Sequence, residues 1–212
     1  MERIQNIRQR RVTRLVKGIV ARVVDLFASP LYVEEMFFNV DTIRKECYQR
    51  QLNNPGKVNS NIGGWQSKDF HLPDIFFNNL MFGIESASNK LANSIGIHPC
   101  KIDNFWININ SKYNLNEKHD HPRCQLSGVY YVKVPPNSGS IQFYHPMDRY
   151  ITRDWNRSEE YTPYNSSVWG CEPKENDLYI FPSWIEHMVT PNLSDEDRIS
   201  ISFNLVSNIY IN

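Results

Sequence analysis

The sequence predicts an α+β fold in which helices come first and short strands follow. Apolar residues between positions 74 and 94 recur at helical spacing, which indicates an amphipathic helix. After position 100 the apolar residues fall into short alternating runs separated by Pro, Gly and Asn, as expected for strands and turns. About seven or eight strands spaced in this way are typical of a double-sheet jelly roll.

The composition limits the class of protein. A chain of 212 residues suits one domain with a full core. The 23 basic and 23 acidic residues balance, so no whole-molecule field favours nucleic acid or an anionic membrane. The four cysteines contain no C-x-x-C pair, which predicts free thiols in a reducing, cytoplasmic compartment. No apolar run approaches the ~20 residues that a membrane span needs.

Residues 1–23 form a basic arm that differs from the rest of the chain. The first 24 residues hold seven Lys or Arg and a single acid, Glu2. Their Ile, Val and Leu residues lie near helical spacing, so an amphipathic basic helix is expected. Such a helix packs on the domain with its basic face in water, or contacts an anionic surface or a protein partner. An organelle-targeting peptide has the same composition.

Two elements are expected before the amphipathic helix. The alternation in "DLFASPLYVEEMFF", which contains Pro30, predicts an edge strand that opens the folded domain near Leu26. Asp41 is expected to cap the N-terminus of a helix that runs to about Gln51. A loop rich in Gly, Asn and Ser follows. The amphipathic helix should then begin at Asp74 and end at Gly96 and Pro99.

The stretch "NEKHDHPRCQLSGVYYVKV" places two histidines one residue apart beside a strand-like run. If the strand begins here, His119 and His121 point to one face and Asp120 points to the other. Two of three ligands for a metal ion would then lie together.

Four other histidines remain in the sequence. His71 and His98 precede the strands and are expected to be structural. His145 and His187 are the candidates for a third ligand, and His187 starts a strand after "LYIFPSW". His145 resembles His121 only in that a proline follows it, so a structural role is favoured for it.

The chain resembles the Fe(II)- and 2-oxoglutarate-dependent oxygenases, with their distal histidine and downstream R-x-S. It resembles more closely a subfamily of these proteins from bacteria and tailed bacteriophages. The resemblance covers about residues 24–206. It is carried by five motifs in order: LF-x-x-P at 26–30, GGWQS at 63–67, H-x-HP-x-x-x-LSGVYY at 119–131, FPSW-x-x-H-x-V-x-P at 181–191 and R-x-SISFN at 198–204.

The resemblance implies a double-stranded β-helix domain over residues 24–212, with helical support at 40–98 and the barrel at 101–206. It implies a dioxygenase that uses Fe(II), 2-oxoglutarate and O2, hydroxylates a substrate, and releases succinate and CO2. A facial triad of ligands leaves three metal positions free for the co-substrate and O2.

The metal ligands implied by the resemblance are His119, His121 and His187. The broad family has a carboxylate where this chain has His121, whereas the subfamily has histidine. Asp120 is the less favoured substitute, because strand parity points it away.

The resemblance also implies the co-substrate residues. Arg198 is expected to pair with the distal carboxylate of 2-oxoglutarate, which a guanidinium fork matches. Tyr131 is expected to donate to the same carboxylate, while Tyr130 faces the other layer. Ser200 shares a face with Arg198 and assists, and Asn108 lines the pocket.

Two other functions remain open from the sequence. A three-histidine cupin-type metalloenzyme would bind metal without 2-oxoglutarate, but it has no need of Arg198. A non-catalytic jelly-roll protein, such as a phage component associated with the virion, would explain the basic arm. If the chain is phage-encoded, the expected location is the host cytoplasm. Nothing in the sequence identifies the prime substrate.

Overall fold

The computed structural model describes residues 14–16, 19–21, 24–154 and 160–207, which fall into two compact units, Met1–Pro30 and Leu31–Asn212. In the first unit, β1 (Arg14–Val16) and β2 (Ile19–Ala21) pair as an antiparallel hairpin. The predicted helix is therefore wrong for these residues, and the rest of that prediction lies outside the described residues. Val and Ile stiffen the backbone toward strand geometry, and a short isolated helix is marginal in water.

The second unit opens with an edge strand that begins later than expected. β3 (Tyr32–Glu35) pairs with one edge of the larger sheet, whereas Leu26 and Phe27 are exposed. Pro30 has no N–H to donate to a ladder, so pairing starts beyond it.

Helix α1 (Val40–Leu52) is capped by Asn39 rather than by Asp41. The side-chain oxygen of Asn39 accepts a hydrogen bond from the N–H of Thr42, at 3.1 Å. Asp41 lies in the first turn instead, where a carboxylate also interacts favourably with the helix dipole.

Helix α2 (Asn78–Ile95) starts four residues later than Asp74 and ends at Gly96, as expected. Asp74 forms a turn in front of the helix, because its carboxylate accepts the N–H groups of Phe76 and Phe77. Gly96 has a φ of 76°, a left-handed conformation that glycine adopts without strain.

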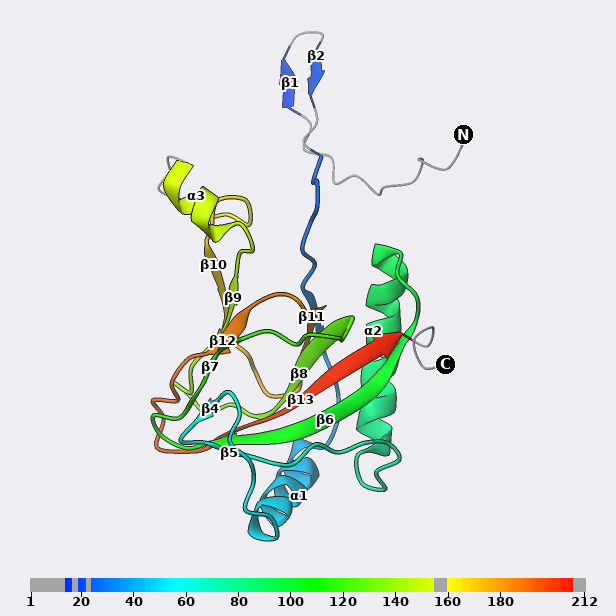
Figure 1. The fold of residues 1–212 in the computed structure, drawn as a ribbon, viewed down its shortest axis with the longest axis vertical. Coiled ribbons are helices and arrows are strands. Elements are labelled where there is room, and N and C mark those ends of the chain that lie inside the picture. Colours follow the sequence, from blue (N-terminus) through cyan, green and yellow to red (C-terminus); the bar gives the residue numbers. More distant parts are fainter. Residues whose placement is uncertain (1–13, 17–18, 22–23, 155–159, 208–212) are drawn as a thin grey trace. The chain divides into compact units, whose positions relative to one another are not determined.

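Two antiparallel sheets form the body of the domain (Figure 1). The larger sheet has the order β3-β11-β8-β13-β6-β5 and the smaller sheet the order β10-β9-β12-β7-β4. The α+β prediction is confirmed. The remaining elements are β4 (Asn61–Ile62), β5 (Trp65–Gln66), β6 (Cys100–Asn110), β7 (Leu115–His119), β8 (Leu126–Lys133), β9 (Ile141–Tyr144), α3 (Asp148–Asp154), β10 (Val168–Cys171), β11 (Asp177–Pro182), β12 (His187–Val189) and β13 (Arg198–Ser207).

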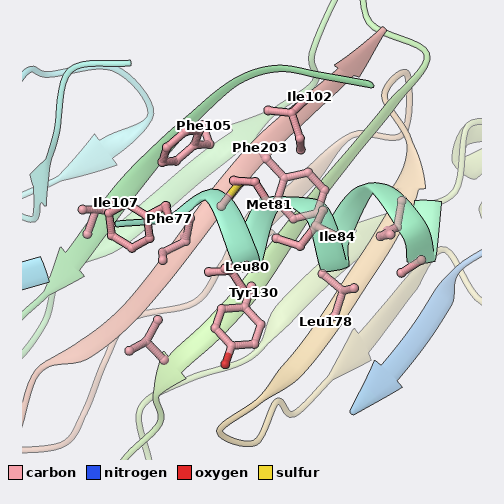
Figure 2. Packing of buried hydrophobic residues seen from close by; sticks show 14 of the residues in the cluster. Phe77, Leu80, Met81, Ile84, Ile102, Phe105, Ile107, Tyr130, Leu178 and Phe203 are labelled. Carbon is pink, nitrogen blue, oxygen red and sulfur yellow. The ribbon is translucent and has the colours of Figure 1, made fainter. Parts of the chain in front are cut away.

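The larger sheet buries both of its faces, and alternate residues of each strand take part in different cores. Its outer face packs under α2, with Phe105 and Phe203 from the sheet meeting Met81 and Ile84 from the helix (Figure 2). Its inner face, which includes Tyr131, packs against residues of the smaller sheet. Tyr130 belongs to the outer core and hydrogen-bonds Asn176. The predicted division between Tyr130 and Tyr131 is thus confirmed.

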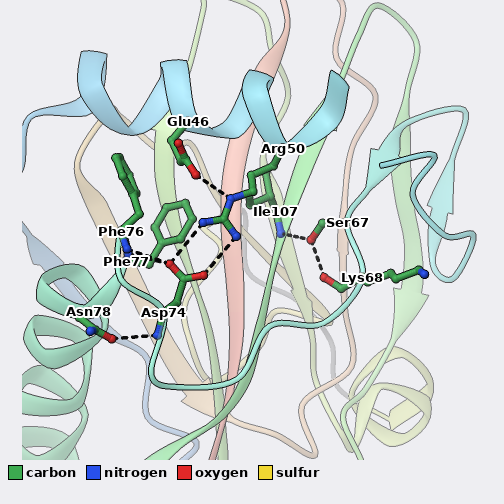
Figure 3. A network of polar contacts seen from close by, with 9 residues as sticks. All are labelled: Glu46, Arg50, Ser67, Lys68, Asp74, Phe76, Phe77, Asn78 and Ile107. Atoms are coloured by element: carbon green, nitrogen blue, oxygen red, sulfur yellow. Dashed lines mark hydrogen bonds and ion pairs between the residues drawn. The ribbon is translucent and has the colours of Figure 1, made fainter. Parts of the chain in front are cut away.

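A polar network ties α1 to the turn before α2 (Figure 3). Arg50 pairs with Glu46 at 2.6 Å and with Asp74 at 3.1 Å. Nearby, the hydroxyl of Ser67 accepts the N–H of Ile107 at 3.0 Å. The contact of Ser67 holds the segment that follows β5 against β6.

The four cysteines, Cys47, Cys100, Cys124 and Cys171, are free thiols, as expected. Within the described part of the chain, the search for a helix long and apolar enough to cross a membrane finds none.

Candidate metal centre

Two of the predicted ligands face each other across the smaller sheet. His187 of β12 and His119 of β7 are direct partners in the antiparallel register. Their ring centroids lie 4.4 Å apart. The pairing of β7 with β12, which are distant in sequence, therefore brings His187 next to His119.

A β-bulge turns His119 toward the cavity. His187 pairs with His119 and Val189 pairs with Asn116, so two residues of β7 lie opposite the single residue Met188. Both Asn116 and His119 line the cavity, although strand alternation would place them on opposite faces. Bulges commonly redirect side chains at functional sites.

The third histidine reaches the cluster from a loop, not from a strand. β7 ends at His119, so the expected parity between His119 and His121 does not apply. The N–H of His121 donates to the carbonyl of Ser183 at 3.0 Å, which anchors the loop beside the start of β12. The ring centroid of His121 lies 5.0 Å from that of His119 and 5.1 Å from that of His187.

The three imidazoles are arranged as metal ligands would be. One ligand nitrogen from each lies within 4.8 Å of the others. The Nδ1 atoms of His119 and His187 lie 2.6 and 3.0 Å from the carbonyl oxygens of Glu117 and Ile185. When Nδ1 donates to such a carbonyl, Nε2 keeps its lone pair for a metal.

Burial keeps these histidines neutral. Burial, with a smaller contribution from the nearby His187 and His119, lowers the pKa of His121 to about 3. Burial lowers the pKa of His187 to about 4, again with help from His119. The pKa of His119 is also lowered, chiefly by burial. All three are therefore in the form that binds metal at neutral pH.

The other candidate ligands lie elsewhere in the described part of the chain. Asp120 is exposed and is not part of the group that could hold an ion. His145 accepts the N–H of Met147, and His71 lies 2.8 Å from the carbonyl of Asp103. His98 is exposed and outside the group as well.

Arg198 is a buried cation that lines the same cavity. Its side chain is 1% exposed. One guanidinium nitrogen, Nη1, donates to the carbonyls of Ser138 and Thr190, while Nη2 has no partner among the residues that the structure describes. The ion pairs of the described residues include none to Arg198. An unpaired buried charge is costly, so this position suits an anionic ligand.

The other predicted co-substrate residues lie beside Arg198. Ser200 pairs with Asn108 on one side and with Tyr131 on the other, and Ser200 and Asn108 line the cavity. The hydroxyl of Tyr131 and the side-chain oxygen of Asn108 are buried without partners. Burial raises the pKa of Tyr131, although Arg198 opposes that shift, so its hydroxyl keeps its proton for donation.

The cavity has both polar and apolar lining residues. Ser60, Asn108 and Asn116 are among the polar ones, and Ile141 and Phe181 are among the apolar ones. It encloses about 30 Å³, which suits water-sized groups. A five-carbon diacid therefore requires the lining side chains to move apart.

Two aromatic residues at the metal cluster were missed by the sequence reasoning. The ring of Trp106 lies 5.7 Å from that of His121, and the ring of Phe181 lies 4.7 Å from that of His187. A signal was available for Trp106, because strand alternation places it on the same face as Asn108. No sequence signal indicated that the carbonyls of Ser138 and Thr190 would hold Arg198.

Comparisons with known proteins agree with this geometry. Residues 104–204 match the family model described as "Putative 2OG-Fe(II) oxygenase". No curated protein matches the sequence. Among solved structures, a Pseudomonas putida prolyl-4-hydroxylase is 12% identical, covers 84% of this chain and 92% of its own, and has a TM-score of 0.60.

Two further structures are similar over most of the chain. HygX from Streptomyces hygroscopicus, with nickel and 2-oxoglutarate bound, is 13% identical over 86% of this chain and 84% of its own, with a TM-score of 0.57. The viral collagen prolyl hydroxylase vCPH from Paramecium Bursaria Chlorella virus-1, a 2-oxoglutarate complex, is 12% identical over 84% and 96%, with a TM-score of 0.55. These likenesses confirm the predicted jelly-roll fold.

Proposed function

We propose that this chain, whose residues 104–204 match the family model described as "Putative 2OG-Fe(II) oxygenase", hydroxylates a substrate while converting 2-oxoglutarate and O2 to succinate and CO2. The observation that carries this proposal is the buried guanidinium of Arg198, which lacks an acidic partner among the described residues and shares its cavity with three neutral histidines. A dianionic co-substrate would satisfy both features at once.

The residues of the cavity fit the two groups that the family uses, Fe(II) and 2-oxoglutarate. His119, His121 and His187 would hold the metal through their free ring nitrogens. Arg198 and Tyr131 would bind the distal carboxylate, because both present buried groups without a protein partner. When bound, iron and the co-substrate activate oxygen for attack on a C–H bond.

The chain's own contribution is binding, orientation and exclusion of water. The bulge in β7 and the anchored loop of His121 orient the three imidazoles. Val129, Ile141 and Phe181 are buried apolar residues that line the cavity, and they keep water from the reacting groups. Ser200 and Asn108 add polar contacts between the metal cluster and Arg198.

A ligand set of three histidines leaves the metal with one more net positive charge than a set with one carboxylate. Neutral imidazoles are good ligands for iron, so the set holds the ion but neutralises less of its charge. The arginine then argues against the three-histidine metalloenzyme that does not use 2-oxoglutarate, since such an enzyme gains nothing from a buried unpaired cation.

The proposal is tested by titrating 2-oxoglutarate calorimetrically into Fe(II)-loaded protein without oxygen. Glutarate is the matched control, because it has both carboxylates but no keto oxygen. We expect 2-oxoglutarate to bind more tightly, since its keto oxygen adds a bond to the metal. Equal affinities, or no binding of either diacid, would contradict the proposal.

The bacterial or bacteriophage source, the location and a partner for the basic arm stay predictions from the sequence, which does not identify the prime substrate.

A further inference from the structure

Two neutral cross-strand rows on the inner face of the larger sheet run beside the three histidines. Direct register partners on adjacent strands point to the same face of a sheet. Trp106, Ser202 and Val129 line the cavity, which identifies this face as the inner one. The first row is Asn104, Asn204, Ser127 and Phe181, and the second is Trp106, Ser202, Val129 and Tyr179.

The first row lies at the metal cluster and away from Arg198. At one end, Asn104 neighbours Trp106, whose ring contacts that of His121. At the other end, Phe181 contacts the ring of His187 at 4.7 Å. Asn204 lies six positions after Arg198 on β13, which is roughly 20 Å along a strand. A group held by this row would therefore lie on the side of the metal opposite the carboxylate site.

The polar side chains of the first row form a hydrogen-bonded chain. The hydroxyl of Ser127 lies 2.9 Å from Oδ1 of Asn204, and Nδ2 of Asn204 lies 3.0 Å from Oδ1 of Asn104. Ser127 is buried, whereas both asparagines are partly exposed. Nδ2 of Asn104 has no protein partner in the described part of the chain. The two amides are thus fixed in orientation and keep a donor for a ligand.

These residue types are unusual at such positions. Asparagine is depleted in strands, yet Asn104 and Asn204 face each other directly. Departures from local preference that have no structural need tend to mark functional sites. None of the eight side chains in the two rows carries a charge, whereas the co-substrate side of the cavity contains Arg198.

We infer that Asn104, Asn204 and Ser127 bind a neutral amide group of the prime substrate, either a peptide bond or a carboxamide. Nδ2 of Asn104 donates to the amide oxygen, and Oδ1 of Asn204 keeps a lone pair for the amide N–H. A carboxylate would instead place an acceptor against Oδ1 of Asn204. Trp106 supplies a flat apolar face beside the amide. This inference rests on the proposed function, because the chain has a prime substrate beside 2-oxoglutarate only if it is an oxygenase.

The test uses N-acetylglycinamide as the probe and NMR spectra of the side-chain NH2 groups as the readout. The protein is loaded with zinc, which is diamagnetic, and with 2-oxoglutarate. We expect saturable shifts of the Asn104 and Asn204 signals. Acetate, which has a carboxylate and no amide, and glycerol, which offers hydroxyls only, should bind at least about tenfold more weakly.

Asn104→Asp removes the free donor at constant size and should weaken N-acetylglycinamide binding about tenfold. Asn93→Asp makes the same substitution at an exposed position of α2 and should leave binding unchanged. Ser127→Ala, which releases Asn204, should weaken the probe several-fold. Thermal unfolding of each variant shows whether the fold is retained.

Equal binding of the three probes, no saturable shift, or parental affinity in Asn104→Asp would overturn the inference. Titration of 2-oxoglutarate into the zinc-loaded protein, before any amide probe is added, separates the inference from the proposed function. If 2-oxoglutarate binds and the amide does not, only the subsite is wrong. If neither metal nor 2-oxoglutarate binds, the proposed function fails first.

Discussion

Arg198 and Tyr131 lie in adjacent rows of the same sheet face, and each ends in a buried polar group without a protein partner. Nη2 of Arg198 and the hydroxyl of Tyr131 are both hydrogen-bond donors. Two such donors side by side require an acceptor, and a carboxylate supplies it. This relationship links the fold of the larger sheet to the proposed co-substrate.

Replacing Arg198 should separate stability from binding. Arg198→Met exchanges a buried unpaired cation for an apolar side chain. We therefore expect the free energy of unfolding of the ligand-free protein to rise by about 1–4 kcal/mol. The same variant should lose about 3–5 kcal/mol of 2-oxoglutarate binding. Tyr131→Phe should lose only about 1 kcal/mol of binding. Denaturant titration and calorimetry measure the two effects, and tight binding in Arg198→Met would contradict the assignment.

The ligand set should respond to single histidine replacements. His119→Ala, His121→Ala and His187→Ala each break a three-point chelate, so each should lower Fe(II) affinity greatly. His145→Ala and His71→Ala are the matched controls, because both residues lie outside the cluster. Equilibrium dialysis of iron measures the affinities. An affinity in His187→Ala equal to that of the parent would exclude the triad.

Metal-free protein should lose stability as the pH falls. The folded pKa of His187 is about 4, below the ordinary value of about 6.5. Between these values the unfolded chain takes up a proton that the folded protein does not, so the free energy of unfolding decreases with decreasing pH. At pH 5 the loss from His187 is about 2 kcal/mol relative to pH 7.5. His187→Asn should flatten the slope measured by urea unfolding, and an unchanged slope would contradict the burial argument.

Gly128 of the LSGVYY motif is required by close packing. A Cβ at this position would lie 2.4 Å from both the ring of Phe203 and the carbonyl oxygen of Tyr179. Gly128→Ala should therefore lower the free energy of unfolding by at least about 3 kcal/mol, the upper end of the usual cost of overpacking. Gly170→Ala is the control, since nothing lies within 4 Å of its Cβ. Similar unfolding midpoints for the two variants would show that the strands shift to accommodate a Cβ at position 128, and would contradict the packing argument.

The basic arm should be dispensable for the cavity. Every residue proposed to bind iron or 2-oxoglutarate follows residue 107, so removal of residues 1–22 should leave iron and 2-oxoglutarate binding intact. The same truncation should abolish any salt-sensitive retention on an anionic resin. Iron titration and a salt gradient make the comparison. Loss of iron binding on truncation would show that the arm belongs to the fold.

The sequence predicted the site better than it predicted the local structure of the site. Motif order indicated His119, His121, His187 and Arg198, and the structure brings all four to one cavity. The parity argument for the first two was wrong, because β7 ends at His119 after a bulge. Side-chain alternation in one strand carries no information about a bulge, which depends on pairing with β12.

Other elements escaped prediction because their residues carry weak patterns. Strand β10 is a largely exposed edge strand, so it shows no alternation of apolar and polar residues. β7 contains Asn, Glu and Lys, which are depleted in strands. It forms because β4 and β12 supply partners on both sides. Such pairing comes from tertiary structure rather than from local preference.

The central claim, that one cavity holds iron and 2-oxoglutarate together, is tested most directly by absorption spectra recorded without oxygen. We predict a weak visible charge-transfer band that appears only when Fe(II) and 2-oxoglutarate are both added to the parent protein. The band should be absent in His187→Ala and retained in His145→Ala. No band in the parent, or the same band in His187→Ala, would contradict the account.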